Sequence, residues 1–155
     1  MVAIDIRLRD NEGMELPAAP SDLARELTES ADLEWLRELV DLLDRQVRTE
    51  PLERLVELWG LSNAAAARLF GVSRQAFSKW LSNGPPSDRT DDIASVATIT
   101  DTLDRYVKRE RIPAVVRRRA DVLDDRSIIE SLEAGEYSRT ARAAEAMLDL
   151  RRIQP

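Results

Sequence analysis

Four polar side chains between residues 74 and 79 have the chemistry of hydrogen bonding rather than of bond breaking. An Arg guanidinium bonds guanine bidentately, a Gln amide bonds adenine in the same way, and Ser and Lys suit bases or phosphate oxygens. In this chain the groups belong to Arg74, Gln75, Ser78 and Lys79. The sequence contains no His and no Cys, which excludes a His general base, a Cys nucleophile and an ordinary zinc site. We therefore expect no enzyme, no metal site and no cofactor.

Two short helices and a sharp turn, from Leu61 to Gly84, are predicted to position these side chains. Ser62 and Ser73 can each cap the helix that follows. Gly71 lies where the chain must turn, because Gly reaches positive φ without strain. A small residue before the turn and apolar residues around it are expected to point inward: Ala67, Leu69, Val72, Phe77 and Trp80.

The run Gly71-Val72-Ser73-Arg74-Gln75-Ala76-Phe77-Ser78-Lys79-Trp80 resembles the Xre/Cro-type helix-turn-helix family. Phe77 departs from the family pattern, which usually has Ile or Val there. The resemblance implies that the second helix enters the DNA major groove, where Arg74 and Gln75 read bases. It gives a predicted DNA-binding set of Asn63, Ser73, Arg74, Gln75, Ser78, Lys79 and Asn83. The alternative is an ordinary helical hairpin whose polar residues are only solvated.

The net charge of −6 does not argue against nucleic acid, because the acidic residues are unevenly distributed. Residues 1–48 carry 12 acidic and 6 basic residues, residues 49–90 carry 4 and 5, and residues 91–155 carry 13 and 12. Phosphate attraction depends on the local potential within about 10 Å. The middle segment is only weakly basic, so we expect modest DNA affinity for each monomer.

The composition predicts a globular, cytoplasmic protein. Hydrophobic residues make up 43% and charged residues 34% of the chain. No stretch approaches the roughly 18 to 20 apolar residues of a membrane span. The N-terminal residues lack the basic and apolar regions of a signal peptide.

The N-terminal third is predicted to contain a strand followed by helices. Residues 2–8 alternate between apolar and polar as a short strand does, and residues 14–16 are the candidate for a returning second strand. The segment Pro17 to Pro20 is expected to break regular secondary structure, and Ser21 is expected to cap the next helix.

An apolar stripe marks the helix that is predicted from about Asp32 to Val47. Leu39 and Leu42 widen the stripe, which either joins the core or pairs with the same helix of a second chain. Spacings of three and four residues give the predicted dimer set Leu33, Leu36, Val40, Leu43 and Val47. A homodimer of this kind would read an inverted-repeat operator in double-stranded DNA.

The remaining elements are also predicted to be helical, so the fold class is mainly α. A helix is expected to restart at Thr49-Glu50-Pro51 and to stop at Gly60, and a long helix is expected from about Asp91 to Arg109. Pro113 fits the first turn of a further helix. The predicted domains are 1–48 for packing or dimerisation, 49–90 for DNA binding and 91–155 for partner binding.

The tail Arg126-Ser127-Ile128-Ile129-Glu130-Ser131-Leu132-Glu133-Ala134-Gly135-Glu136-Tyr137 resembles the C-terminal segment of the Xre–MbcA–ParS antitoxin family. From the residues alone, Ser127 is a helix cap and Gly135 a helix stop, with a last helix from about Ser138 to Leu150. The resemblance implies a repressor that also binds a toxin, commonly a RES-domain enzyme that degrades NAD. The predicted partner-binding set is Arg126, Ser127, Gly135, Glu136 and Tyr137. A stand-alone regulator, a protein-binding adaptor and a hairpin that only completes the core remain alternatives.

Seven basic residues between Arg105 and Arg119, against the one acidic residue Glu110, form a second charged segment. It could contact phosphate, bind an acidic partner or be solvated. The nearby Asp121, Asp124 and Asp125 lack the spacing of a calcium loop and are interpreted as surface residues.

Overall fold

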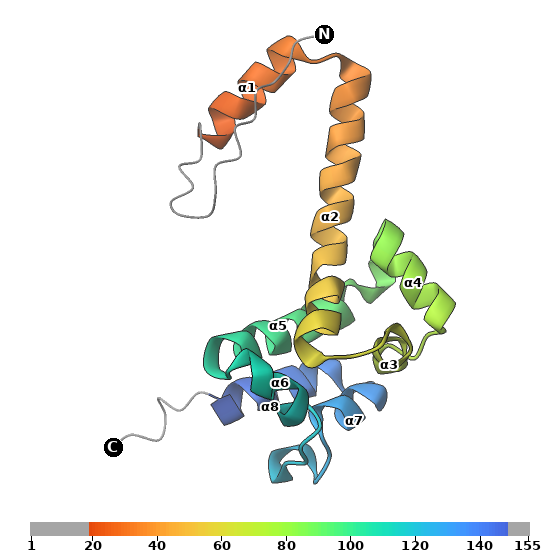
Figure 1. Ribbon diagram of the computed structural model, residues 1–155, viewed down its shortest axis with the longest axis vertical. Helices are drawn as coiled ribbons and strands as arrows, with labels where there is room; N and C mark the ends of the chain where they lie inside the picture. The colour runs from red at the N-terminus through yellow and green to blue at the C-terminus, as the bar shows by residue number, and fades with distance from the viewer. Residues whose placement is uncertain (1–18, 149–155) are drawn as a thin grey trace. The chain divides into compact units, whose positions relative to one another are not determined.

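The computed structural model describes residues 19–148, where the regular secondary structure is helical and short turns and loops join the helices (Figure 1). The mainly α fold class is therefore confirmed for these residues. The isolated bridge between Ala120 and Arg126 is their only β pairing, and the strands predicted for residues 2–8 and 14–16 lie outside them. Eight α-helices occur within this range: α1 (Pro20–Ser30), α2 (Leu33–Trp59), α3 (Asn63–Leu69), α4 (Arg74–Asn83), α5 (Thr90–Tyr106), α6 (Ile112–Val115), α7 (Ile128–Glu133) and α8 (Tyr137–Leu148).

The chain divides into two compact units, with the boundary between Asp44 and Arg45. The first unit contains α1 and the start of α2. The second contains every later helix, so the predicted boundary between residues 90 and 91 lies inside it. None of the described helices combines the length and apolarity that crossing a membrane requires.

The first helix begins one residue before the predicted cap. Ala19 is the N-cap of α1 and makes no side-chain capping bond, while Pro20 occupies the first turn. The prediction that Ser21 caps this helix is therefore wrong. Proline is suited to the first turn because its φ is preset and its missing N–H has no helical partner there.

Helix α2 runs without a break through Pro51, so the predicted restart at Thr49-Glu50-Pro51 is wrong. A proline inside a helix removes one backbone hydrogen bond and costs about 3 kcal/mol. Burial of a large apolar side chain contributes about 1.5–3 kcal/mol, and the last turns of α2 bury Leu52, Leu55 and Trp59 almost completely. This packing offsets the cost of Pro51.

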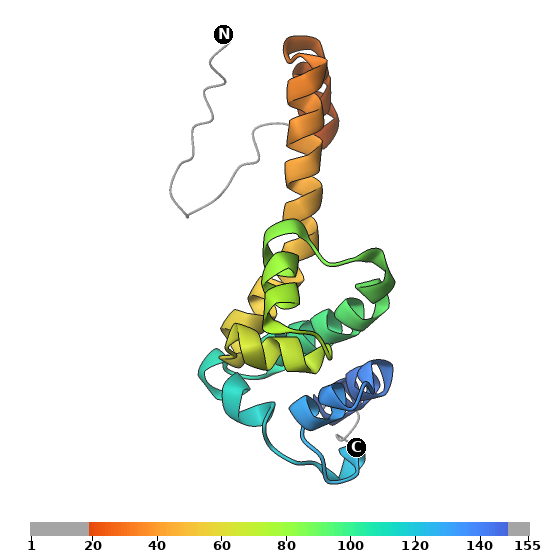
Figure 2. The same cartoon turned by 90° about the vertical axis from the view of Figure 1, so that its right-hand side faces the viewer.

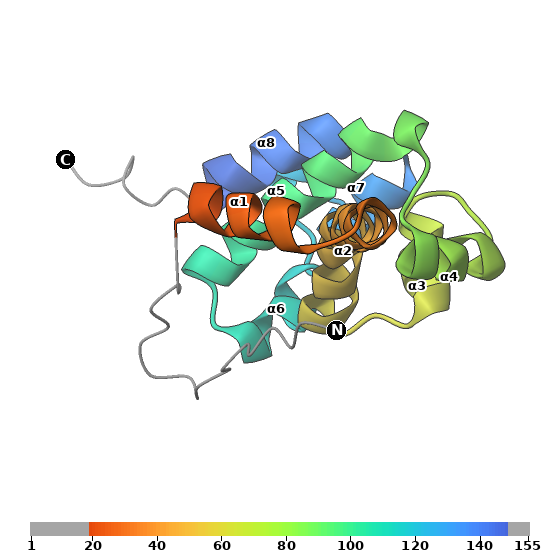
Figure 3. The ribbon, with the colours of Figure 1, turned by 90° about the horizontal axis from the view of Figure 1, so that it is seen from above.

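One hydrophobic core holds the second unit together and draws on α2 to α8. Helices α5 and α8 lie side by side (Figure 2 and Figure 3). The face of α8 towards the core is made of small residues, Thr140, Ala141 and Ala144, which let two helices approach closely. Helix α5 ends at Tyr106 rather than at the predicted Arg109, because Val107 turns to an extended conformation and packs against the core.

The predicted C-terminal helix signals are confirmed locally. The Ser127 hydroxyl accepts a hydrogen bond from the Glu130 amide at 3.1 Å, and the Glu130 carboxylate accepts one from the Ser127 amide at 2.7 Å. Gly135 follows α7 with φ of +80°. Pro113 lies in the first turn of α6, as predicted.

Candidate functional site

Helices α3 and α4 are joined by a short turn that carries the local signals read from the sequence. The Ser62 hydroxyl accepts a hydrogen bond from the Ala65 amide at 3.2 Å, and the Ser73 hydroxyl accepts one from the Ala76 amide at 3.1 Å. Gly71 has φ of +62°. Both predicted caps and the predicted glycine turn are confirmed.

An aromatic cluster fixes the inward side of this helix pair. The Phe70 ring lies 6.1 Å from the Phe77 ring, 5.7 Å from Trp80 and 6.1 Å from Tyr137, centroid to centroid. The predicted small residue Ala67 is 1% exposed, and Phe77 is fully buried. The prediction that these side chains point inward is confirmed, and Phe70 is an additional central member.

The outward side of α4 carries side chains that are available to a ligand. Arg74, Gln75, Lys79 and Asn83 are exposed, and none of the four side chains hydrogen-bonds to any residue in the range 19–148. Asn63 and Ser78 are half-buried. Ser73 is exposed, but its hydroxyl accepts the capping bond. The structure thus brings Arg74, Gln75 and Lys79 onto one short helix.

The charge around α4 is locally positive. Between Glu57 and Asp88 the chain contains no acidic residue and three basic ones, Arg68, Arg74 and Lys79. Arg68 pairs with Glu133 of α7 at 3.4 Å. Arg74 and Lys79 have no such partner among the described residues, and the amide groups at the start of α4 add to the positive potential there.

Two tethers that sequence reasoning missed hold the ends of the pair. The Arg48 guanidinium, from α2, donates to the Pro85 carbonyl just beyond α4. The Tyr137 hydroxyl donates to the Leu69 carbonyl at the end of α3 at 2.8 Å. Both contacts join residues far apart in the chain, and neither has a spacing signal in the sequence.

The predicted partner-binding residues make contacts within the chain. Arg126 pairs with Glu136 at 2.8 Å, and Arg139 pairs with Glu136 and Asp124 at 2.8 and 2.7 Å. The hydrogen bond from Arg126 is the largest of the effects that hold the pKa of Glu136 below its usual range. Ser127 is buried in its capping box. These contacts fix the shape of the segment from Arg126 to Tyr137.

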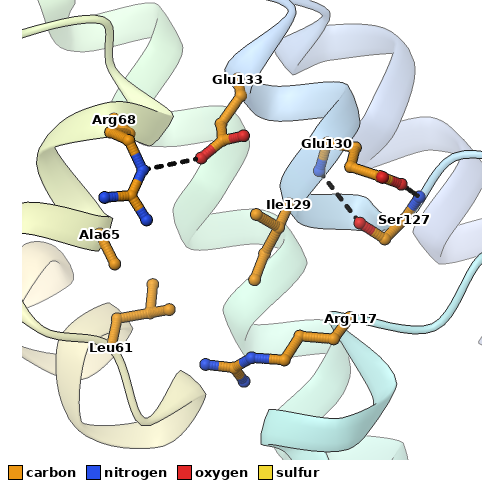
Figure 4. A pocket seen from close by; sticks show the side chains of 8 residues that line it. All are labelled: Leu61, Ala65, Arg68, Arg117, Ser127, Ile129, Glu130 and Glu133. Atoms are coloured by element: carbon orange, nitrogen blue, oxygen red, sulfur yellow. Dashed lines mark hydrogen bonds and ion pairs between the residues drawn. The ribbon is translucent and has the colours of Figure 1, made fainter.

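A small pocket adjoins this segment (Figure 4). The Arg68–Glu133 ion pair lies at one side of the pocket, and the Ile129 side chain points into it. The Arg117 guanidinium donates to the carbonyls of Trp59 and Pro113 at 3.2 and 2.5 Å. The pocket measures about 260 Å³, below the usual size of a small-molecule site, and is lined by Leu61, Ala65, Arg68, Arg117, Ser127, Ile129, Glu130 and Glu133.

The basic segment is only partly neutralised within the chain. Arg109 pairs with Asp104 at 2.8 Å, and Arg119 pairs with Glu130 at 2.8 Å. Its other exposed cations make no ion pair with a residue that the structure describes: Arg105, Lys108, Arg111, Arg117 and Arg118. Helix α6, within this segment, lies away from α4 (Figure 1 and Figure 3).

The predicted dimer residues lie on the first half of α2, and most of them are exposed. Leu33 is 64% exposed, Val40 62%, Leu43 52% and Val47 72%, while Leu36 is half-buried. The stripe is therefore not part of the core that the described residues form.

Comparisons with protein-family models, with curated proteins and with solved structures found no match for this chain. Across residues 19–148 no three acidic side chains gather closely enough to hold a metal ion.

Proposed function

We propose that this protein is a sequence-specific DNA-binding transcriptional repressor that uses α3 and α4 as a helix-turn-helix. The observation that carries the proposal concerns the two faces of α4: its inward face is held in the core, and its outward face presents polar side chains that are available to a ligand. The aromatic cluster holds α4, and the exposed Arg74 and Gln75 in its first turn have no partner among the described residues. Side chains at that end of a recognition helix reach base edges in the major groove.

The remaining predicted residues suit backbone contacts. Lys79 is exposed further along α4, and Asn63 opens α3. The amides at the start of α4, next to Ser73, suit a phosphate oxygen. Ser78 is half-buried and Asn83 is exposed at the far end of the helix, where side chains contact either bases or phosphate.

A titration of the purified protein against its own upstream DNA, at two salt concentrations, tests the proposal. We expect selective binding that weakens steeply with salt, because released counterions dominate the affinity. A homodimer should prefer an inverted repeat with half-sites about 34–36 Å apart. Absence of salt-dependent binding would favour a protein-binding adaptor built on the same helices.

A second candidate function is the antitoxin role, and the structure of the tail favours it. The segment from Arg126 to Tyr137 is fixed by ion pairs and by the Tyr137 hydrogen bond, and it adjoins the pocket around Ile129. A fixed segment beside a small pocket of mixed apolar and charged lining suits a protein partner. The partner implied by the family resemblance is a RES-type toxin.

Point substitutions at the pocket test the antitoxin role better than deletions. Removing everything after Val122 would delete α8, which packs along α5. Ile129→Asp places a charge in the pocket and should weaken capture of a co-expressed toxin, whereas Glu145→Gln on the exposed side of α8 should not. Equal capture by both variants would count against this surface.

A further inference from the structure

Exposed apolar side chains are concentrated in one short part of the chain. Of the nine large hydrophobic side chains that are exposed among residues 19–148, one lies on α1 and six lie on the first half of α2: Leu33, Trp35, Val40, Leu42, Leu43 and Val47. Contiguous apolar surface of this kind usually marks an interaction site.

The residues of α2 follow a heptad pattern. Leu33, Val40 and Val47 are seven residues apart and take the first apolar position, called a. Leu36 and Leu43 take the second apolar position, called d. The pattern ends where Glu50 and Arg54 occupy the next d and a positions. A stripe of a and d residues on a helix packs against a matching stripe on another helix.

We propose that two copies of this chain associate through α2 as a parallel, in-register helix pair centred on Val40. The stripe is self-complementary, since each apolar residue meets its own copy across a two-fold axis. Val at two of the three a positions and Leu at both d positions is the combination that favours two parallel strands. Leu39, Leu42 and Trp35 border the stripe on one side and enlarge the apolar surface that the pair would cover.

The length of the stripe favours the parallel orientation over the antiparallel one. In an antiparallel pair an a residue packs opposite a d residue of the partner. One such register puts Leu33 opposite Glu50, and the next puts Val47 opposite a position ahead of Leu33, the first residue of α2. Only the parallel register matches all five stripe residues with apolar partners.

Charge complementarity supports the same register. Asp32 and Arg37 occupy the flanking g and e positions, which face each other across a parallel pair. One oxygen of Asp32 accepts the Trp35 amide at 2.8 Å, and its second oxygen is left for Arg37 of the other copy. Arg37 makes no hydrogen bond or ion pair with any described residue of its own chain. Exposed pairs of this type add little affinity, but they select the register.

The function of this dimer rests on the proposed repressor role. The association of the two chains itself requires no DNA. A parallel pair has its two-fold axis along the helices. The same symmetry relates the two halves of an inverted-repeat operator.

Single cysteines test the orientation directly, because the natural chain contains none. We expect full-length Leu33→Cys and Val47→Cys each to form a disulfide dimer on mild oxidation, since paired a positions lie within disulfide reach. Glu38→Cys, on the opposite side of α2, should not cross-link. If neither single variant cross-links while a double variant that joins an a to a d position does (Leu36→Cys/Val47→Cys or Leu33→Cys/Leu43→Cys), the pair is antiparallel and the proposal is overturned.

Sedimentation of the full chain tests the association itself. The wild type should sediment at twice its mass of 17.5 kDa, and Val40→Asp should sediment as a monomer at micromolar concentration. Arg45→Gln changes the charge by the same amount away from the stripe and should stay dimeric. A monomeric wild type or a dimeric Val40→Asp would overturn the proposal. If the protein is monomeric but binds DNA, the dimer proposal fails and the repressor proposal does not. If the cross-linked dimer forms but binds no DNA, only the repressor proposal is refuted.

Discussion

At the scale of single residues, Tyr137 links parts of the chain that are 68 positions apart. Its ring stacks on Phe70, and its hydroxyl donates to the Leu69 carbonyl at 2.8 Å. Burial is the main cause that raises the pKa of Tyr137, so the hydroxyl stays protonated and remains a donor at neutral pH. The start of α8 is thereby attached to the end of α3.

Replacing Tyr137 with Phe should lower the free energy of unfolding by about 1 kcal/mol, because it removes one hydrogen bond and leaves the Leu69 carbonyl without this donor. Urea denaturation measures the change. Tyr106→Phe is the matched control, since Tyr106 is 47% exposed. Equal stability of the two variants would show that the tether contributes nothing.

Replacing Arg74 with Ala should weaken operator binding by about 1–3 kcal/mol and relax discrimination at one base position. The measurement is a titration against the operator and against a set of single-base variants of it. Arg142→Ala on α8 is the control, because among residues 19–148 that exposed side chain donates only to the Ser138 carbonyl of its own helix. Unchanged affinity and preference in Arg74→Ala would remove this residue from the interface.

At the scale of elements, one glycine lies in the turn before α4 and another at the end of α4, and they differ in backbone conformation and surroundings. Gly71 has φ of +62° and open space where a side chain would be. Gly84 has φ of +83° and ψ of 153°, and a Cβ there would lie 3.1 Å from the Arg48 Nε. This second conformation is nearly exclusive to glycine.

The two glycines should therefore respond differently to alanine. Gly71→Ala should cost about 1–2 kcal/mol, the strain of a left-handed residue. Gly84→Ala should cost more, because backbone strain is joined by displacement of the Arg48 side chain. Thermal unfolding of both variants compares them, and a smaller loss for Gly84→Ala would contradict the role given to Arg48.

The ion pairs around α7 make stability sensitive to acid. Arg126 holds the pKa of Glu136 below its usual range, Arg139 does the same for Asp124, and the Ser127 amide does so for Glu130. A carboxylate with a lowered pKa in the folded state stabilises the fold above its ordinary pKa and stops doing so as the pH falls through the lowered value.

The melting temperature should therefore fall as the pH is lowered from 6 to 3, and Glu136→Gln should show a shallower fall from a lower starting point. Differential scanning calorimetry at several pH values measures both. Glu145→Gln provides the comparison, since Glu145 makes no ion pair with a described residue. Parallel curves for Glu136→Gln and the wild type would refute the contribution of Glu136.

The elements predicted from the sequence are those that local chemistry determines. Ser62, Ser73 and Ser127 cap helices through bonds to residues three positions away, and Gly71 relieves a local turn. The continuity of α2 through Pro51 was missed because distant burial outweighs a local cost. Among the site residues, the tethers of Arg48 and Tyr137 had no signal for the same reason.

At the scale of the whole molecule, one core serves the second unit from Leu52 to Ala144. The residues on α4 that we propose for DNA binding therefore depend on α8, although more than fifty positions separate the two helices. Ala144 in α8 is fully buried. A destabilising substitution on this face of α8 should therefore also disturb the position of α4, because both helices pack into the same core.

Ala144→Asp should destabilise the second unit by about 3 kcal/mol or more, because an unpaired charge is buried. It should abolish DNA binding as well. Ala146→Asp, exposed on the same helix, should cost about 0.5 kcal/mol or less. Circular dichroism and limited proteolysis distinguish the two, and DNA binding that survives Ala144→Asp would mean that α3 and α4 fold without α8.

The contact between Tyr137 and Leu69 also bears on the order in which the protein matures during translation. The ribosome delivers the α2 stripe first and the helices of the core last. If the chain pairs through α2 as we propose, two nascent chains on neighbouring ribosomes would associate before either has a finished core. A chain interrupted before Tyr137 lacks the residue that completes the aromatic cluster, so prematurely terminated products would join the proposed dimer without contributing a competent α4.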